Sequence, residues 1–416
     1  MPAEAKEEET RVIDSYAPDG RYAWIRLALT LLTACIANAG MWLVVTVLPA
    51  VEAEFGTSRA ASALPYTLTM VGFALGNFFL GRAVDLFGVT RSLVIAALAL
   101  IAGFGLAVLA PSMALLSAAP LLIGLASAIG FGPLLADISH WFVRRRGIAV
   151  ALVASGNYLS GAIWPFLLAD MQAEQGWRSV YLTMLLVTFL IIPLALTLRR
   201  QVTRDITDAA EASAQARTRS VGLSPRALQY LLCLAGVGCC VAMSMPQVHI
   251  VALCVDYGFG AVVGAEMLSL MLLGGVASRI VSGLVADQLG GVWTLLIGST
   301  LQCVALFLYL PAGDIVSLYL VSLVFGLSQG GIVPSYALIV REYMPAREAG
   351  ARVGFVLMAT IFGMALGGWL SGQIYDWTGS YQLAFVNGIV WNFLNIGIMA
   401  WLLLRSRPAR GVLAPA

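Results

Sequence analysis

The segments GRAVDLFG (residues 81–88) and GLVADQLG (residues 283–290) share one pattern, with glycine at the first and last positions and aspartate at the fifth. They lie 202 residues apart, and Gly124 recurs as Gly326 at the same offset. A constant offset over several landmarks is hard to obtain by chance. We therefore expect the chain to consist of two similar halves.

The composition indicates an integral membrane protein. Hydrophobic residues make up 60% of the chain and charged residues only 11%, whereas a soluble domain has about 25% charged residues. So few charges could not cover a soluble surface, but a surface that faces lipid must be apolar. The net charge of +2 gives no reason to expect a nucleic-acid partner.

A spanning helix needs about 20 mainly apolar residues, and the chain contains twelve such stretches. The predicted fold is all-α, with twelve transmembrane helices in two parallel six-helix bundles at 23–198 and 226–404. Residues 1–22 are an N-terminal segment, 199–225 a polar linker and 405–416 a tail. The predicted helices cover residues 23–50, 60–82, 91–110, 113–138, 147–171, 177–198, 226–253, 261–285, 291–311, 315–340, 349–373 and 382–404.

The arginines predict the orientation of these helices. Nearly all of the loop arginines fall on one side of the predicted membrane, and basic loops stay in the cytoplasm. Both termini and the linker are therefore expected to be cytoplasmic, in a multi-pass protein of the cell membrane (the cell inner membrane). Parallel halves are the architecture of secondary transporters that rock around a substrate site near mid-membrane.

The two glycine–aspartate segments resemble the loop signature of the major facilitator superfamily. In that family the aspartate and arginine hold the cytoplasmic helix ends together. The resemblance implies a gate role, against the alternative of an ordinary solvated turn, which the second copy disfavours. The gate and motif residues that it implies are Gly81, Arg82, Asp85, Gly88, Arg91 and Asp287.

Two further segments resemble the signatures of the monocarboxylate transporter family, in a bacterial-type branch close to the oxalate/formate antiporters. They are DGRYAW at residues 19–24 and WFVRRRGIA at residues 141–149. The resemblance implies a carrier of small monocarboxylates such as lactate or pyruvate, and motif roles for Asp19, Trp24, Arg145 and Arg146. Membrane-interface anchoring and helix packing could also explain these residues.

Arg279 lies about midway along the eighth predicted helix. A charge at that depth is costly, so it is expected to face a cavity or a partner. Its guanidinium matches a carboxylate in shape and charge. The family resemblance implies that this arginine holds the carboxylate of the substrate. The alternative is a structural salt bridge to another helix.

Other polar residues within the predicted helices are candidates for completing the substrate site, although such groups also join helices without any further role. The family resemblance implies an aspartate in many relatives where this chain has Gly275, and a lysine in some where it has residues 40–43. Those groups are credited with proton coupling, so the resemblance leaves the proton route of this chain open. His249 and Asp256 are the remaining proton-coupling candidates. The substrate-binding candidates besides Arg279 are Asn38, Tyr66, Asn157, Tyr158, Gln329 and Tyr336.

The predicted function is proton-coupled symport of a small monocarboxylate by alternating access. Residues 353–372 of the eleventh helix contain no Lys, Arg or His, so one buried cation suits one carboxylate. The alternatives are an anion exchanger of the oxalate/formate kind, a uniporter, and a non-transporting receptor on a transporter fold. No enzymatic motif, cofactor, metal or obligate protein partner is expected; the expected partners are the substrate, a proton and the lipid bilayer.

Overall fold

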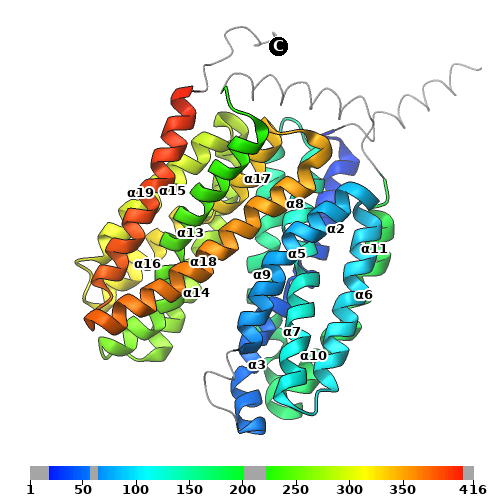
Figure 1. Cartoon of the computed structure of the whole chain (residues 1–416). Coiled ribbons are helices and arrows are strands. Elements are labelled where there is room, and N and C mark those ends of the chain that lie inside the picture. Colours follow the sequence, from blue (N-terminus) through cyan, green and yellow to red (C-terminus); the bar gives the residue numbers. More distant parts are fainter. Residues whose placement is uncertain (1–17, 57–63, 201–221, 406–416) are drawn as a thin grey trace, which may run out of the picture. The chain divides into compact units, whose positions relative to one another are not determined.

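The computed structural model describes residues 18–56, 64–200 and 222–405, and these residues contain helices and no strands (Figure 1). Twelve segments within them are long and apolar enough to cross a membrane, which confirms the predicted all-α class and the number of spans. The helices are α2 (Arg21–Ala37), α3 (Ala39–Phe55), α5 (Leu64–Phe87), α6 (Val89–Val108), α7 (Met113–Ser127), η1 (Ala128–Gly130), α8 (Gly132–Trp141), α9 (Arg146–Gln175), α10 (Trp177–Thr188), α11 (Ile191–Thr197), α13 (Pro225–Asp256), α14 (Ala261–Leu289), α15 (Gly291–Tyr309), α16 (Ile315–Gln329), α17 (Ile332–Tyr343), η2 (Ala346–Glu348), α18 (Ala349–Thr378) and α19 (Gln382–Arg405).

The chain divides into two compact units. The first contains α2 to α11 together with Glu348–Met358, which is the last residue of η2 and the start of α18. The second contains α13 to α17, the rest of α18 and α19. The predicted segment 1–22 and linker 199–225 fall largely outside the described residues, and the domain boundaries stay a prediction.

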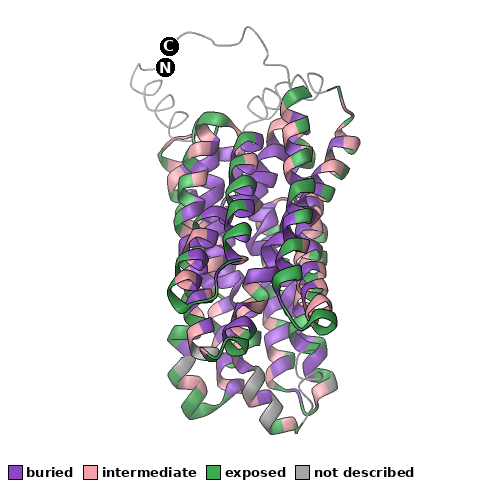
Figure 2. Ribbon diagram, turned by 90° about the vertical axis from the view of Figure 1, so that its left-hand side faces the viewer, coloured by how far each residue is buried: buried purple, intermediate pink, exposed green. Residues whose placement is uncertain are grey.

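Each unit is packed through glycines at equivalent positions. A Cβ atom at Gly124 of α7 would lie 2.0 Å from the Thr69 carbonyl oxygen of α5, and one at Gly326 of α16 would lie 2.4 Å from that of Met271 in α14. Only glycine allows backbones to approach this closely. Buried residues face the interior of each helix group and exposed ones face outward (Figure 2), and many of the exposed residues are large and apolar, such as Phe166 and Leu404.

The second and eighth spans extend beyond their predicted ends at residues 82 and 285. Helix α5 continues to Phe87 and α14 to Leu289, so Asp85 and Asp287 lie in the last turns of helices. The helices stop at Gly88 and Gly290, which have φ angles of 81° and 83° with extended ψ angles. That conformation is essentially restricted to glycine, and it explains the last glycine of the repeated segment.

Four spans that the sequence predicts as continuous are interrupted within the described residues. The breaks lie at Asn38, at 128–131, at 189–190 and at 330–331. Two of them lie at equivalent positions of the repeat, because the fourth span pauses between α7 and α8 and the tenth between α16 and α17. Proline lies in the first turn after each break, as the second residue of α8 (Pro133) and the third residue of α17 (Pro334). Its missing N–H costs little there, because the first N–H groups of a helix have no partner within the helix.

Candidate functional site

Arg279 lies three residues past the middle of the span Val263–Leu289, and 3% of its surface is exposed. Its Nε–H donates a hydrogen bond to the Gly330 carbonyl oxygen at 3.2 Å. Gly330 lies at the break between α16 and α17, so the arginine reaches the one place in the tenth span where the helical hydrogen bonds pause. The buried guanidinium is thus held between α14 and this break.

The backbones of α14 and α16 meet closely beside Arg279. A Cβ atom at Gly330 would lie 2.1 Å from the Gly275 carbonyl oxygen, and one at Gly331 would lie 2.1 Å from both Cβ and Oγ of Ser282. The break is therefore fixed against α14 one turn on either side of the arginine. The Gly275 carbonyl group, at the position where the resemblance implies an aspartate in many relatives, therefore forms one side of this contact.

Asn77 occupies the position of the first half that corresponds to Arg279, 202 residues earlier. Its Oδ1 accepts a hydrogen bond from the Gly132 N–H at 3.0 Å, at the break before α8. Its Nδ2 donates to the Phe73 carbonyl oxygen at 2.8 Å. The same position thus holds a helix break in both halves, with a neutral amide in the first and a cation in the second.

Asn38 and Asn157 come together on the other side of the break in the fourth span. Asn38 Nδ2 donates to the carbonyl oxygens of Ala34 and Gly130 at 2.8 and 3.0 Å, and its Oδ1 accepts from Asn157 Nδ2 at 3.1 Å. Trp42 Nε1 donates to the Asn157 carbonyl oxygen at 2.8 Å. Both N–H donors of Asn38 are engaged, so its amide joins the breaks of the first and fourth spans.

The other substrate-binding candidates lie in different surroundings. Tyr66 is 39% exposed on α5, and Tyr158 is half-buried on α9. Tyr336 is fully buried; its hydroxyl accepts from Asn395 Nδ2 and donates to Cys239 Sγ. Gln329 ends α16 beside Gly330, and 1% of its surface is exposed. Of these, Gln329 is the one adjacent in sequence to the Arg279 contact.

His249 lies near the C-terminal end of α13, and its ring contacts Gly368 of α18 and Tyr381 between α18 and α19. A carbonyl oxygen only accepts, so Nε2 carries the proton that is donated to the Gly368 carbonyl oxygen at 2.9 Å. Nδ1 then accepts from the Tyr381 hydroxyl at 3.2 Å. Burial raises the pKa of Tyr381 to about 12, which keeps this hydroxyl protonated.

Asp256, the second proton-coupling candidate, joins the same cluster through tyrosines. Its carboxylate is hydrogen-bonded to Tyr375, whose ring stacks on that of Tyr381 with centroids 4.4 Å apart. Asp376 also lies close enough to act electrostatically on Tyr381. His249 and Asp256 are seven residues apart in sequence, and these aromatic side chains connect them.

The repeated segment in the first half contacts the start of α18. Asp85 accepts hydrogen bonds from the N–H groups of Gly350 and Ala351 at 2.8 and 2.7 Å, within the first compact unit. A carboxylate at a helix N-terminus is favoured by the helix dipole. A Cβ atom at Gly81 would lie 2.2 Å from the Gly350 carbonyl oxygen, so both the aspartate and the first glycine of the motif serve this contact.

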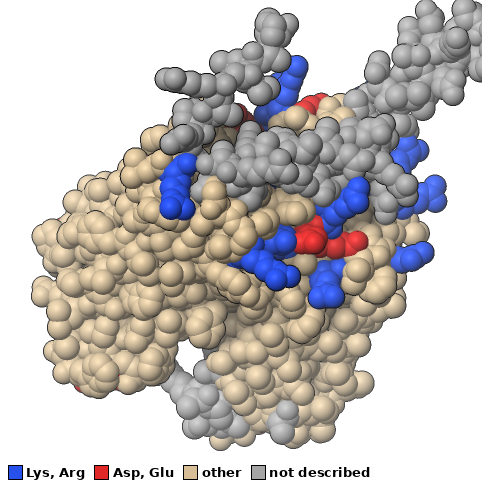
Figure 3. Space-filling model, turned by 45° about the horizontal axis from the view of Figure 1, so that its top comes forward, with Lys and Arg blue, Asp and Glu red and all other residues tan. Residues whose placement is uncertain are grey.

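The remaining motif residues of that segment differ in exposure. Arg82 and Arg91 are exposed, and Asp287 is half-buried at the end of α14. Arginine side chains gather at one end of the helices, and the visible flanks carry almost none (Figure 3). The gate roles of these residues stay predictions.

The two segments that resemble the monocarboxylate transporter signatures meet in the structure. The Asp19 carboxylate accepts from the N–H groups of Val143, Arg144 and Arg145 at 3.0–3.1 Å. Asp19 has a φ angle of 61°, a left-handed conformation that aspartate adopts more readily than most residues. Its N–H donates to the Trp141 carbonyl oxygen. One aspartate thus fastens the start of α2 to the loop after α8.

The basic triplet completes this junction. The Arg146 Nε donates to the carbonyl oxygens of Ser139 and Phe142, each at 3.0 Å, and so caps the end of α8. The Arg145 guanidinium lies 5.7 Å from the ring centre of Trp24, which packs edge-on against Phe142. These contacts give Trp24, Arg145 and Arg146 a structural role at the end of the first unit.

Sequence reasoning missed a buried ion pair next to this junction. Arg26 is fully buried and its Nη2 lies 2.8 Å from Asp137 Oδ2. Its Nη1 donates to the carbonyl oxygens of Leu198 and Arg200, and its guanidinium lies over the Trp141 ring. Arg26 therefore ties α2 to α8 and to the end of α11. The available signal was two opposite charges within the predicted spans 23–50 and 113–138.

A second ion pair, also missed, fastens the opposite end of the first unit. Arg178 Nη1 contacts both Glu54 oxygens at 2.6 and 2.7 Å, and Trp177 Nε1 donates to the same carboxylate. Arg178 Nη2 donates to the Ala110 carbonyl oxygen. The Arg178 hydrogen bond holds the pKa of Glu54 below its usual value.

Repeated motifs, internal helix breaks and a buried arginine beside one break are the architecture of secondary membrane transporters. The sequence profile of the Major Facilitator Superfamily matches residues 30–283 and 232–416. The chain belongs to this superfamily, and it is a multi-pass membrane transporter rather than an enzyme.

Relatives of known type include monocarboxylate transporters. The chain is 26% identical over 268 residues to monocarboxylate transporter 13 of Rattus norvegicus, with 64% of this chain and 62% of that protein covered. It is 29% identical to monocarboxylate transporter 11 of Homo sapiens, with 64% and 58% covered. The chain thus spans about three fifths of the length of these relatives. They are mammalian, and a placement near the oxalate/formate antiporters stays a prediction.

A solved structure with the same fold is that of the human organic anion transporter MFSD10. The two chains superimpose with a TM-score of 0.71 at 15% identity, and the match covers 90% of this chain and 98% of the other. At this identity the likeness establishes the fold alone.

Proposed function

We propose that this protein carries small monocarboxylates across the cell membrane together with a proton, by alternating access, and that Arg279 binds the carboxylate. The observation that supports this most directly is the burial of Arg279 at a helix break in the middle of a span. A guanidinium in hydrocarbon is costly, and its planar fork of donors matches the two oxygens of a carboxylate. The similarity to monocarboxylate transporters points to the same substrate class.

Proton coupling is supported by the cluster around His249. Imidazole is a common proton carrier in proteins, and the Nδ1 of His249 faces the Tyr381 hydroxyl, which can donate to a neutral ring or accept from a protonated one. Moving a proton together with the anion makes the cycle electroneutral, which avoids about 2.3 kcal/mol per charge per 100 mV. The distribution of arginines also leads us to propose that both termini lie in the cytoplasm.

The test is uptake of labelled lactate and pyruvate into proteoliposomes, with unlabelled mono- and dicarboxylates as competitors. Arg279→Gln should reduce uptake at least about 30-fold, because losing one partner of a buried charge pair costs 2 kcal/mol or more. Arg279→Lys keeps the charge but loses the planar fork of donors, so its uptake should lie between those of wild type and Arg279→Gln. Arg178→Gln is the matched control, since its ion pair lies at the end of the first unit.

Normal uptake by a folded Arg279→Gln protein would contradict the anchor role. Wild-type uptake that is indifferent to the pH gradient would favour uniport, and uptake that requires a carboxylate inside the vesicles would favour exchange. A protein that binds the acids but accumulates none would be a receptor.

A further inference from the structure

The side chain of Gln329 is buried without hydrogen bonds. Its exposed fraction is 1%, and neither Oε1 nor Nε2 has a hydrogen-bond partner in the described part of the chain. Leaving a buried polar group unpaired costs roughly 1–3 kcal/mol. An amide with both ends unsatisfied is therefore a considerable burden on the stability of this unit, unless a partner arrives from outside.

Gln329 lies next to the residue that Arg279 contacts. It is the last residue of α16 and immediately precedes Gly330, whose carbonyl oxygen accepts from Arg279 Nε. Gly330 is fixed against Gly275 by a backbone approach that admits no side chain. The Gln329 backbone is consequently held next to the arginine contact, at the same helix break.

Gln302 is a second buried glutamine of the same unit, and its side chain joins neighbouring helices by hydrogen bonds. It is fully buried, and its Nε2 donates to the Cys239 carbonyl oxygen at 3.0 Å and to Asn392 Oδ1 at 3.4 Å. It joins α15 to α13 and α19. Its Oε1 has no partner among the described residues, so the contrast with Gln329 lies in the amide nitrogen, which finds two acceptors in Gln302 and none in Gln329.

We propose that the Gln329 amide is a specificity-determining group that binds the polar substituent next to the substrate carboxylate. This rests on the proposed function, in which Arg279 binds the carboxylate itself. An amide offers both a donor and an acceptor, so it satisfies a hydroxyl in either direction, whereas a keto oxygen engages only Nε2. The expected order of preference is 2-hydroxy acid, then 2-oxo acid, then the unsubstituted acid.

The experiment compares Gln329→Met with Gln302→Met in purified protein. Uptake of lactate, pyruvate and propionate is measured in proteoliposomes, and the melting temperature is measured in detergent without substrate. Gln329→Met should lower the lactate-to-propionate uptake ratio about 3- to 10-fold, the range of one to two neutral hydrogen bonds. It should also raise the melting temperature, because an apolar side chain replaces an unpaired amide. Gln302→Met should lower the melting temperature and leave the ratio unchanged.

An unchanged ratio in Gln329→Met would overturn the inference, and so would a wild type that does not discriminate lactate from propionate. Gln329→Asn, which keeps the amide on a shorter side chain, is the second variant and should lower the ratio partially. Failure of the proposed function is distinguishable, because the wild type would then take up none of the three acids or Arg279→Gln would transport normally. The inference about Gln329 fails alone when Arg279→Gln loses uptake and Gln329→Met keeps the wild-type ratio.

Discussion

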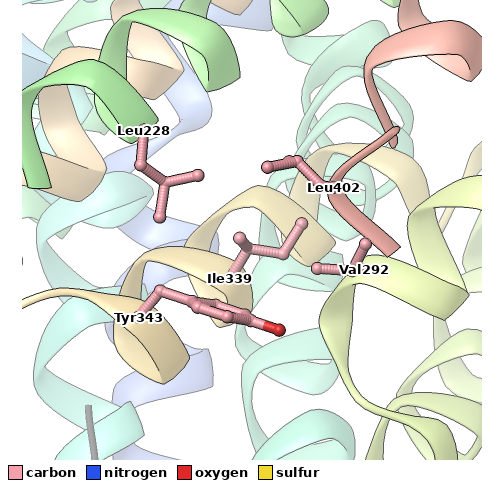
Figure 4. A pocket seen from close by; sticks show the side chains of 5 residues that line it. All are labelled: Leu228, Val292, Ile339, Tyr343 and Leu402. Carbon is pink, nitrogen blue, oxygen red and sulfur yellow. The ribbon is translucent and has the colours of Figure 1, made fainter. Parts of the chain in front are cut away.

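Where the first half pairs Arg26 with Asp137, the second half has Leu228 and Ile339 at the corresponding positions, 202 residues later. Leu228 and Ile339 line a small pocket with Val292, Tyr343 and Leu402 (Figure 4). The same place in the repeat is thus held by charge in one half and by apolar packing in the other.

The opposite ends of the two halves differ in a related way. Glu54 pairs with Arg178 in the first half. The corresponding positions of the second half are Asp256, 202 residues after Glu54, and Tyr381, 203 residues after Arg178, at the offset that also relates Gly176 to Gly379. The ion pair is replaced by a group of titratable side chains that includes His249. Salt bridges fasten the first half at both ends, whereas the second half carries a cation in the middle of its span. In the proposed function, the groups that bind the anion and exchange the proton, Arg279 and His249, both belong to the second half.

The largest effect is expected when residues of the second half are moved into the first. Arg26→Leu alone leaves Asp137 without its buried partner and should lower the free energy of unfolding by about 3–5 kcal/mol. Asp137→Ile should do the same to Arg26. The double variant should recover to within about 1–2 kcal/mol of wild type, because apolar packing can replace a buried pair. Denaturation of wild type, the two single variants and the double variant in detergent gives the interaction energy between Arg26 and Asp137. If the two single losses of stability simply add in the double variant, the ion pair does not stabilise this unit.

A smaller effect is expected at His249. If it carries the coupled proton, it must take that proton up from the outside in each cycle, and this loading increases as the external pH is lowered from 7.5 to 5.5. Uptake by the wild type should follow that change, and His249→Gln should transport with little dependence on external pH. Tyr381→Phe, which removes the hydroxyl that faces Nδ1, should shift the pH profile without abolishing uptake. A full pH response in His249→Gln would remove the histidine from the proton route.

The smallest effect is expected at the Glu54–Arg178 pair, in which both side chains are more than a third exposed. Because the folded pKa of Glu54 is lowered, the pair contributes stability above the ordinary carboxyl pKa of about 4.3, and this is lost as the pH falls through the folded value. The contribution should stay below about 1 kcal/mol. Melting temperatures at pH 7 and pH 4 should therefore drop slightly more for wild type than for Glu54→Gln. Equal drops would show that the pair contributes nothing.

The sequence predicted the features that depend on local composition. Runs of about 20 apolar residues fixed the number of spans, because hydrocarbon requires apolar side chains and internally satisfied backbone. The buried arginine was recognisable for the same reason, since a charge within such a run is costly wherever the helix lies. Glycines at a constant offset indicated the repeat, and Gly88 and Gly290 turned out to end the helices themselves.

Features that depend on pairing across the chain were not predictable in this way. The Arg26–Asp137 pair joins residues 111 positions apart, and nothing local specifies which of several charges will meet. The sequence predicts continuous helix across the breaks at 128–131 and 330–331, because apolar side chains continue through them. In the structure, Asn38, Asn77 and Arg279 from other spans hydrogen-bond the backbone groups there.

The sequence alone identifies this chain as a helical membrane protein built from two similar halves. The apolar runs place it in lipid, and the constant spacing of its glycines indicates the repeat. Only the tertiary structure decided that Arg279 meets a helix break at Gly330, that Gln329 beside it lacks hydrogen bonds, and that Asp19 joins two distant motifs. These depend on hydrogen-bond geometry over a few ångströms, which is set by how the helices pack and not by the order of residues within any one of them.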